Sequence, residues 1–287
     1  MKVNRVSHRS QGIFDASAWL DEGNGILAAA CTTRRTWQTR RLRFDQYLTE
    51  SHTSPSSQAW NELVGLPRAS VLLLAYAVEM YLKAGLVKAY RGCPEPLLGR
   101  DLKTLYGHDL VAAAKAIDFP DVEANQARFQ LLKDAVTFDA RYPIAPKQGI
   151  PFHDLKNRQT ARIWCERDFR KTIALALRVR KHVKRIDSDQ CNPSSIRSFS
   201  IEEGGFLTYR VGGNLRPRIT FALGAHQNAG PANMVGVVKD EAIERKFIHR
   251  LMHEVNDPVL DGLWKRATVL YDDGKRTRDI TGALDSE

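Results

Sequence analysis

The stretch that decides the fold is AYAVEMYLKAGL, residues 75–86, in which Glu79 and Lys83 are the only charged residues. At 3.6 residues per turn, its apolar side chains cover nearly every face of a helix. A helix of this kind lies in the middle of a bundle. The two charges interrupt the apolar run before it reaches the roughly 20 residues that a membrane span needs. We therefore expect the core helix of a soluble protein.

Outward from this stretch, apolar residues at helical spacing extend the core helix over residues 68–90. Pro67 is placed in its first turn, where proline is tolerated. Asp109 is placed to cap a short helix that follows it. The other predicted helices cover residues 16–48, 110–117, 122–138 and 158–186.

Composition changes at the polar stretch DSDQCNPSS, residues 187–195, which we interpret as a linker. Beyond it, short apolar runs separated by glycine-containing turns are typical of paired strands. They predict strands over residues 198–201, 206–211, 218–223, 234–238, 267–271 and 276–280, with a helix over 241–255. The expected fold class is mainly α, with a helical bundle over residues 1–188 followed by a small α+β domain over residues 196–287.

Three motifs follow one another along the chain: AYAVEMYLKAGL at residues 75–86, YGHDL at 106–110 and ARYP at 140–143. In this order and spacing they resemble the HEPN family, whose members are helical bundles of roughly this size and are often dimeric. The resemblance extends over residues 14–186. It implies an antiparallel HEPN-like bundle, a homodimer, and a role in toxin–antitoxin, antiphage-defence or regulatory systems.

Glu79 and Lys83 lie one helical turn apart on a helix that is otherwise built for burial. Burying either charge alone is costly, so the simplest expectation is that the two side chains form an ion pair. Such a pair either fixes the register of the bundle or orients a neighbouring polar group.

His108 and Asp109 follow Gly107 at the predicted start of a helix, where free backbone N–H groups and the helix dipole favour an anion. Asp109 satisfies these donors itself if it is the cap. In the functional alternative, His108 faces a cleft with Arg141 and Tyr142 and contacts a phosphate or a base. Arginine offers a planar fork for phosphate, and tyrosine or histidine stacks on bases.

Many HEPN proteins are metal-independent ribonucleases that carry an arginine followed by a histidine after four to six residues. The histidine moves protons at the 2′-hydroxyl or the leaving oxygen, and the arginine stabilises charge on the phosphorane. This chain departs from that spacing, because seven residues separate Arg100 from His108 and three separate Arg178 from His182. A ribonuclease with His108 and Arg141 as catalytic residues is therefore the second functional class rather than the first.

The formal charge of +10 and the pI of about 9.5 favour acidic partners, of which nucleic acid and nucleotides are the commonest. Residues 156–187 alone carry a net charge of +8. Their basic side chains share one face of the last predicted helix, which either follows a phosphate backbone or is simply solvated. The candidate nucleic-acid or nucleotide ligands are Arg100, Tyr142, Arg167, Lys171, Arg178, Lys181 and Arg185.

Four cysteines stand singly, which argues against a zinc ribbon and a disulfide framework and favours a reducing cytoplasm. His249 and His253 lack the order of a zinc-protease site, and we expect neither a metal nor a cofactor. Three functional classes remain. We favour a protein that binds RNA, DNA or a nucleotide; the alternatives are a divergent ribonuclease toxin or effector and a non-catalytic module that pairs with a protein such as a nucleotidyltransferase antitoxin.

Overall fold

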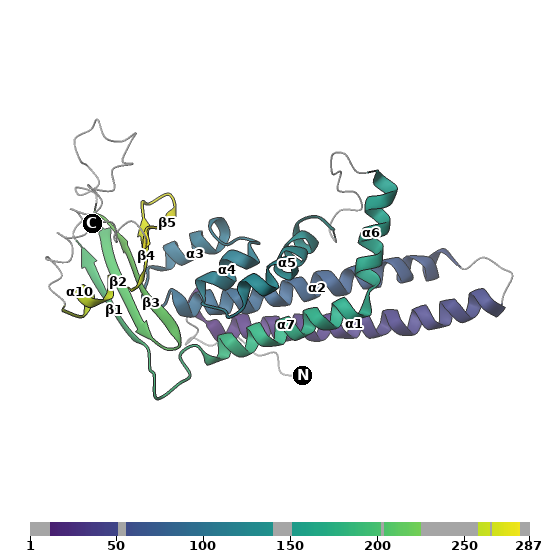
Figure 1. Ribbon diagram of the computed structural model, residues 1–287, viewed down its shortest axis with the longest axis horizontal. Helices are drawn as coiled ribbons and strands as arrows, with labels where there is room; N and C mark the ends of the chain where they lie inside the picture. Colours follow the sequence, from purple (N-terminus) through teal and green to yellow (C-terminus); the bar gives the residue numbers. More distant parts are fainter. Residues whose placement is uncertain are drawn as a thin grey trace. The chain divides into compact units, whose positions relative to one another are not determined.

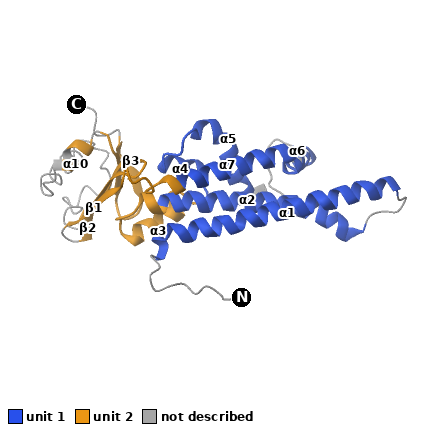
Figure 2. Cartoon of the chain, turned by 90° about the horizontal axis from the view of Figure 1, so that it is seen from below, with its two compact units in different colours: residues 1–86, 108–183 blue, residues 87–107, 184–287 orange. Residues whose placement is uncertain are grey.

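The computed structural model describes residues 12–50, 56–139, 151–201, 204–224, 258–264 and 266–281 (Figure 1). Within them the chain is mainly helical, with a small mixed sheet of five strands in its C-terminal part. The chain divides into two compact units (Figure 2). Unit 1 comprises residues 1–86 and 108–183, and unit 2 comprises residues 87–107 and 184–287. Residues 87–107, which the sequence analysis assigns to the bundle, thus belong to the unit that contains the sheet.

Unit 1 is built on two long helices, α1 (Ala16–Glu50) and α2 (Ser57–Ala89), of which α2 continues past residue 86 into unit 2. A single 3-10 turn, η1 (Gly12–Phe14), precedes α1. The buried residues of α1 recur every three or four positions and so form one stripe along the helix. They are Gly23, Leu27, Ala30, Arg34 and Trp37.

The core of unit 1 is centred on α2, where Ala75, Val78 and Tyr81 are fully buried. Among the described residues, α2 is the one helix long and apolar enough to cross a membrane by length and composition alone. In the most apolar 18-residue stretch of α2, 67% of the residues are buried inside the protein, as in the core helix of a bundle.

The expectation that Pro67 lies in the first turn of α2 is wrong, because the helix begins at Ser57 and runs through the proline. Proline has no N–H to donate to the carbonyl four residues earlier, which is that of Leu63. The indole Nε1–H of Trp37 donates to this carbonyl instead, at 3.1 Å. A side chain of α1 thus replaces the hydrogen bond that Pro67 removes.

The other helices of unit 1 are shorter. They are α4 (Leu110–Ala116), α5 (Val122–Asp134) with a π-helical turn η2 (Ala135–Asp139), α6 (Phe152–Trp164) and α7 (Glu166–Arg185), whose last two residues belong to unit 2. Helices α2, α4 and α7 approach closely at Gly85. A Cβ atom there would lie 2.9 Å from the Ile117 side chain and 3.1 Å from that of Val183.

The prediction of one helix over residues 158–186 is wrong, because the chain leaves helical geometry at Cys165, with φ −70° and ψ 107°. The last carbonyl groups of a helix need donors from elsewhere. The guanidinium group of Arg34 supplies them, donating to the carbonyl of Ile163 at 2.8 Å and to that of Trp164 at 3.3 Å. α6 and α7 are therefore separate helices held at their junction by α1.

Unit 2 contains a five-stranded sheet in the order β1-β2-β3-β4-β5, in which only β3 and β4 pair in parallel. Its core lies between the sheet and α10 and includes Leu207, Ile219, Val269 and Trp264. The elements are α3 (Glu95–Thr104), β1 (Ser195–Ile201), β2 (Gly205–Gly212), β3 (Leu215–Ala222), α10 (Pro258–Leu263), β4 (Thr268–Asp272) and β5 (Thr277–Asp279). The strand predicted over residues 234–238 and the helix over 241–255 lie outside the described residues.

Candidate functional site

Glu79 is a buried acid on α2, and its side chain is only 4% exposed. Each of its carboxylate oxygens has a partner. The ammonium group of Lys83 lies 2.6 Å from Oε1, and Nδ1 of His108 lies 3.0 Å from Oε2. The two charges that the sequence analysis pairs are therefore in contact, and His108 is a third member that it does not place there.

Lys83 is held by more than this carboxylate. Its Nζ lies 5.8 Å from the centre of the Trp19 ring, on α1, which is within the range of a cation–π interaction. Its side chain is 18% exposed, so most of its stem is covered. The ammonium group thus neutralises Glu79 from inside the bundle.

The backbone just before α4 directs the imidazole of His108 toward Glu79. Gly107 adopts a left-handed conformation with φ +42°, which reverses the chain before the helix begins. A carboxylate oxygen can only accept a hydrogen bond, so Nδ1 of His108 donates to Glu79. The His108 side chain is 43% exposed. One edge of the imidazole ring is therefore hydrogen-bonded to the core, and the rest of the ring is partly exposed to solvent.

Asp109 is the N-cap of α4, as the sequence predicts, and accepts a hydrogen bond from the backbone N–H of Ala112 at 3.0 Å. Its other oxygen lies 3.0 Å from the ammonium group of Lys133. Burial alone would raise the pKa of Asp109, but the hydrogen bonds from Ala112 and Lys133 outweigh it and hold this pKa below its usual value. The Asp109 carboxylate therefore satisfies the N–H of Ala112, one of the free donors at the start of α4.

The proposed cleft of His108 with Arg141 and Tyr142 involves residues that lie outside the described part of the chain, as do His249 and His253. That grouping stays a prediction. Among the described residues, no three His, Cys, Asp or Glu side chains are grouped so that they could hold a metal ion.

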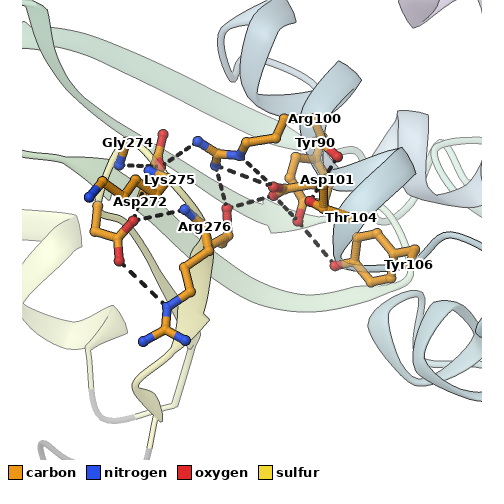
Figure 3. A network of polar contacts seen from close by, with 11 residues as sticks. Tyr90, Arg100, Asp101, Thr104, Tyr106, Asp272, Gly274, Lys275 and Arg276 are labelled. Carbon is orange, nitrogen blue, oxygen red and sulfur yellow. Dashed lines mark hydrogen bonds and ion pairs between the residues drawn. The ribbon is translucent and has the colours of Figure 1, made fainter.

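Arg100, a candidate phosphate ligand, lies in unit 2 and its guanidinium group is occupied by carboxylates (Figure 3). It contacts Asp272 at 2.8 Å and Asp101 at 3.2 Å, and it donates to the Thr277 hydroxyl at 2.9 Å. With 21% of its side chain exposed, it carries little free charge at the surface. This arrangement connects α3 to the β4–β5 hairpin.

Asp101 is the centre of the same network and is fully buried. It accepts hydrogen bonds from the hydroxyl groups of Thr277, at 2.7 Å, and Tyr90, at 3.0 Å. Tyr106 lies 3.0 Å from Tyr90 through their hydroxyl oxygens (Figure 3). Burial raises the pKa of Tyr90 well above its usual value, so this hydroxyl stays a donor to the carboxylate.

The basic face of α7 is exposed as the amphipathic pattern predicts, with Phe169, Leu175, Ala176, Val179 and Val183 buried on the opposite face. We call Arg167, Lys171, Arg178 and Lys181 the α7 stripe. At 3.6 residues per turn, each of the four side chains points within about 40° of their mean direction around the helix axis. Together they span about 21 Å along the helix. All four are exposed, as is Arg185 at the end of the helix.

The charges of the α7 stripe are largely uncompensated. Arg167, Lys171 and Lys181 have no ion-pair or hydrogen-bond partner among the described residues. Arg178 donates to Asn125 at 2.7 Å, a neutral amide on α5 that the sequence analysis does not identify. Helix α7 carries two acids, Glu166 and Asp168, both in its first turn. Glu166 is already held by Arg34 and Arg170, each at 3.0 Å.

Comparison with known proteins adds nothing to this geometry. No protein-family model, curated protein or solved structure matches the chain.

Proposed function

We propose that this chain binds nucleic acid through the α7 stripe, carried on a bundle of the HEPN type. One observation carries the proposal: Arg167, Lys171 and Lys181 are exposed in line on one helix, and none of them has a partner in the part of the chain that the structure describes. A solvated helix face normally mixes both signs of charge, and such a face pairs its cations with acids one turn away. The stripe holds only cations, so an acidic partner would gain from meeting it.

The energetic gain comes from counterion release. Each phosphate neutralised by a lysine or arginine releases condensed cations, which makes the affinity fall steeply as salt rises. Four contacted phosphates on a duplex predict a slope of about −3.6 for the logarithm of affinity against the logarithm of salt concentration. Between 50 and 200 mM salt this corresponds to a loss of roughly 100-fold.

The resemblance to the HEPN family supports the same function. The core helix motif, the GHDL element and the ARYP element follow one another along the sequence in the order of the resemblance. A bundle alone does not define a function, because one fold serves many functions. The stripe is what directs this bundle toward phosphate.

Fluorescence anisotropy with labelled oligonucleotides tests the proposal. The first variant carries glutamine at all four positions of the α7 stripe. A matched control carries glutamine in place of Arg35, Arg43, Arg91 and Lys103, which are exposed cations on other helices and turns. Both variants lose four charges. We expect the stripe variant to lose most of its affinity and nearly all of its salt slope, and the control to keep both.

Two outcomes would refute the proposal. One is that wild-type protein binds no oligonucleotide at 50 mM salt. The other is that the control variant loses as much affinity as the stripe variant, which would reduce the effect to net charge.

A second function, cleavage of RNA, is favoured by the Glu79–His108 contact. A histidine whose Nδ1 donates to a carboxylate presents Nε2 for proton transfer, which is the arrangement a general base requires. In this reaction His108 would take the proton of the 2′-hydroxyl, whose oxygen attacks the adjacent phosphorus to form a 2′,3′-cyclic phosphate. The bond from phosphorus to the 5′-oxygen breaks, and the 5′-oxygen takes up a proton from water. Arg141 is the candidate to stabilise the phosphorane.

The cleavage hypothesis has its own test. His108→Ala should abolish the release of RNA fragments while the far-ultraviolet circular dichroism of the protein is unchanged. Glu79→Gln should leave partial activity with an altered pH profile, because the imidazole remains but loses the carboxylate that orients it. Intact RNA after incubation with excess wild-type enzyme, across several substrates, would rule this function out.

A further inference from the structure

The side chains of the α7 stripe favour one form of nucleic acid, single-stranded or double-stranded, over the other. Proteins that hold single strands combine a basic groove with aromatic side chains on which the bases stack. The stacking compensates for the cost of ordering a flexible strand. A surface made of cations alone has no such compensation.

No aromatic side chain of α7 is available for stacking. Phe169 is 5% exposed and packs under the guanidinium group of Arg34, 4.7 Å from its ring centre. The ring of His182 lies edge-on to Phe119, with 5.6 Å between centres, and its Nε2 lies 2.7 Å from the carbonyl of Ile117. The residue at the centre of the stripe is Ala174, whose methyl group is exposed.

The backbone of the stripe is rigid. Its helix is fixed to the bundle by Leu175, Ala176 and Val179, which are fully buried. Four cations therefore stand on a straight line of about 21 Å. A double helix presents phosphates at regular intervals of about 3.4 Å per strand and stays straight over this length, since its persistence length is about 50 nm. The backbones of both partners are rigid before they meet, so mainly the lysine and arginine side chains have to be ordered, whereas a flexible single strand has to be ordered as well.

From these features we propose that the stripe binds double-stranded nucleic acid through its phosphates, without regard to base sequence. The inference depends on the proposed nucleic-acid binding and narrows it to the duplex form. RNA and DNA duplexes share this phosphate chemistry, and separate arms of the experiment distinguish them.

The test compares a labelled 20-base strand with the same strand annealed to its complement, as DNA and as RNA, at 100 mM salt. We expect at least one duplex to bind ten-fold or more tightly than its single strand. We also expect that scrambling the sequence changes the duplex affinity by less than two-fold. If both single strands bind as tightly as their own duplexes, the inference is overturned while the proposed function stays intact. Absence of binding to all four probes would overturn both.

A gain-of-function variant gives a second readout. Ala174→Trp places one indole between Lys171 and Arg178 on the exposed face. Stacking of one base on it should raise single-strand affinity about five-fold or more and leave duplex affinity unchanged. An equal rise for both forms, or no rise for the single strand, would show that missing aromatic contacts do not set the preference.

Discussion

Glu79 Oε2 and His108 Nδ1 lie 3.0 Å apart, although the glutamate side chain is 4% exposed and the histidine side chain is 43% exposed. The contact therefore joins a carboxylate in the core to an imidazole at the surface. Lys83 balances the carboxylate from the other side at 2.6 Å. The group of three therefore connects α2 to the turn that precedes α4.

Substitutions of Glu79 and Lys83 should have strongly coupled effects on the free energy of unfolding. Lys83→Met is expected to lower the free energy of unfolding by about 3 kcal/mol, because it leaves a buried carboxylate without its ammonium partner. The double variant Glu79→Gln with Lys83→Met should recover part of this loss, since no unpaired charge remains. Urea denaturation of the single and double variants measures the coupling. Losses that simply add would show that the two side chains act independently.

Two glycines of α1 provide a matched pair for the packing of unit 1. A Cβ atom on Gly23 would lie 2.6 Å from the ring of Tyr81. This ring is fully buried, and its hydroxyl group donates a hydrogen bond to Asn24. A Cβ atom on Gly25 would meet nothing within 4 Å. Gly25→Ala should stabilise the protein by about 0.5–1 kcal/mol, because alanine favours the helix. Gly23→Ala should destabilise it by about 1–3 kcal/mol through overpacking. Melting temperatures that shift in the same direction for both variants would contradict this packing.

The pKa of Asp109 gives a pH dependence with a definite sign. Hydrogen bonds from Ala112 and Lys133 overcome burial and lower this pKa in the folded state. The resulting stabilisation is present above the unfolded pKa and is lost as the pH falls through the lower, folded value. Asp109→Ala should cost about 1 kcal/mol at pH 7 through loss of the cap.

Asp109→Asn separates the cap from the charge, since asparagine also caps helices well. Its deficit relative to wild type should be present at pH 7 and should shrink as the pH falls below about 4, the ordinary pKa of an unfolded aspartate, toward the lower pKa of the folded state. Unfolding titrations of both proteins at pH 7 and pH 3 measure this change. A deficit that does not depend on pH would show that the carboxylate charge contributes nothing.

Arg100 should stabilise unit 2 and take no part in binding nucleic acid. Its guanidinium group contacts Asp101 and Asp272, so Arg100→Gln leaves a fully buried carboxylate with fewer donors. We expect a loss of about 2–4 kcal/mol in stability, from a partly exposed arginine that contacts a buried acid. Oligonucleotide affinity at a temperature where the variant is folded should be unchanged. A fall in affinity with unchanged stability would return Arg100 to the list of phosphate ligands.

Local patterns of the sequence were sufficient for several of these features. The apolar surround of Glu79 predicts the core helix, the i, i+4 spacing predicts its contact with Lys83, and the position of Asp109 predicts the cap. Each of these depends on residues within one or two helical turns. The strand positions around residues 206–211 and 267–271 likewise follow from short apolar runs next to turns, and β2 and β4 overlap them.

The features that the sequence analysis misses depend on distant partners. The break at Cys165 is stabilised by Arg34, which lies about 130 residues earlier. Helix α3 is unpredicted because its buried Asp101 depends on Thr277, which lies 176 residues later. His108 reaches Glu79 across 29 residues. No periodicity within a window of one helix contains this information.

The division of unit 2 into residues 87–107 and 184–287 also matters during synthesis. Ribosomes release the chain from the N-terminus, so α3 emerges long before the strands that complete its polar network. Until Thr277 and Asp272 are made, Asp101 lacks the hydroxyl group of Thr277 and Arg100 lacks the carboxylate of Asp272. A chain cut at residue 188 to isolate the bundle would hold α3 permanently in that unfinished state. A productive truncation has to keep the last strands or remove α3 with them.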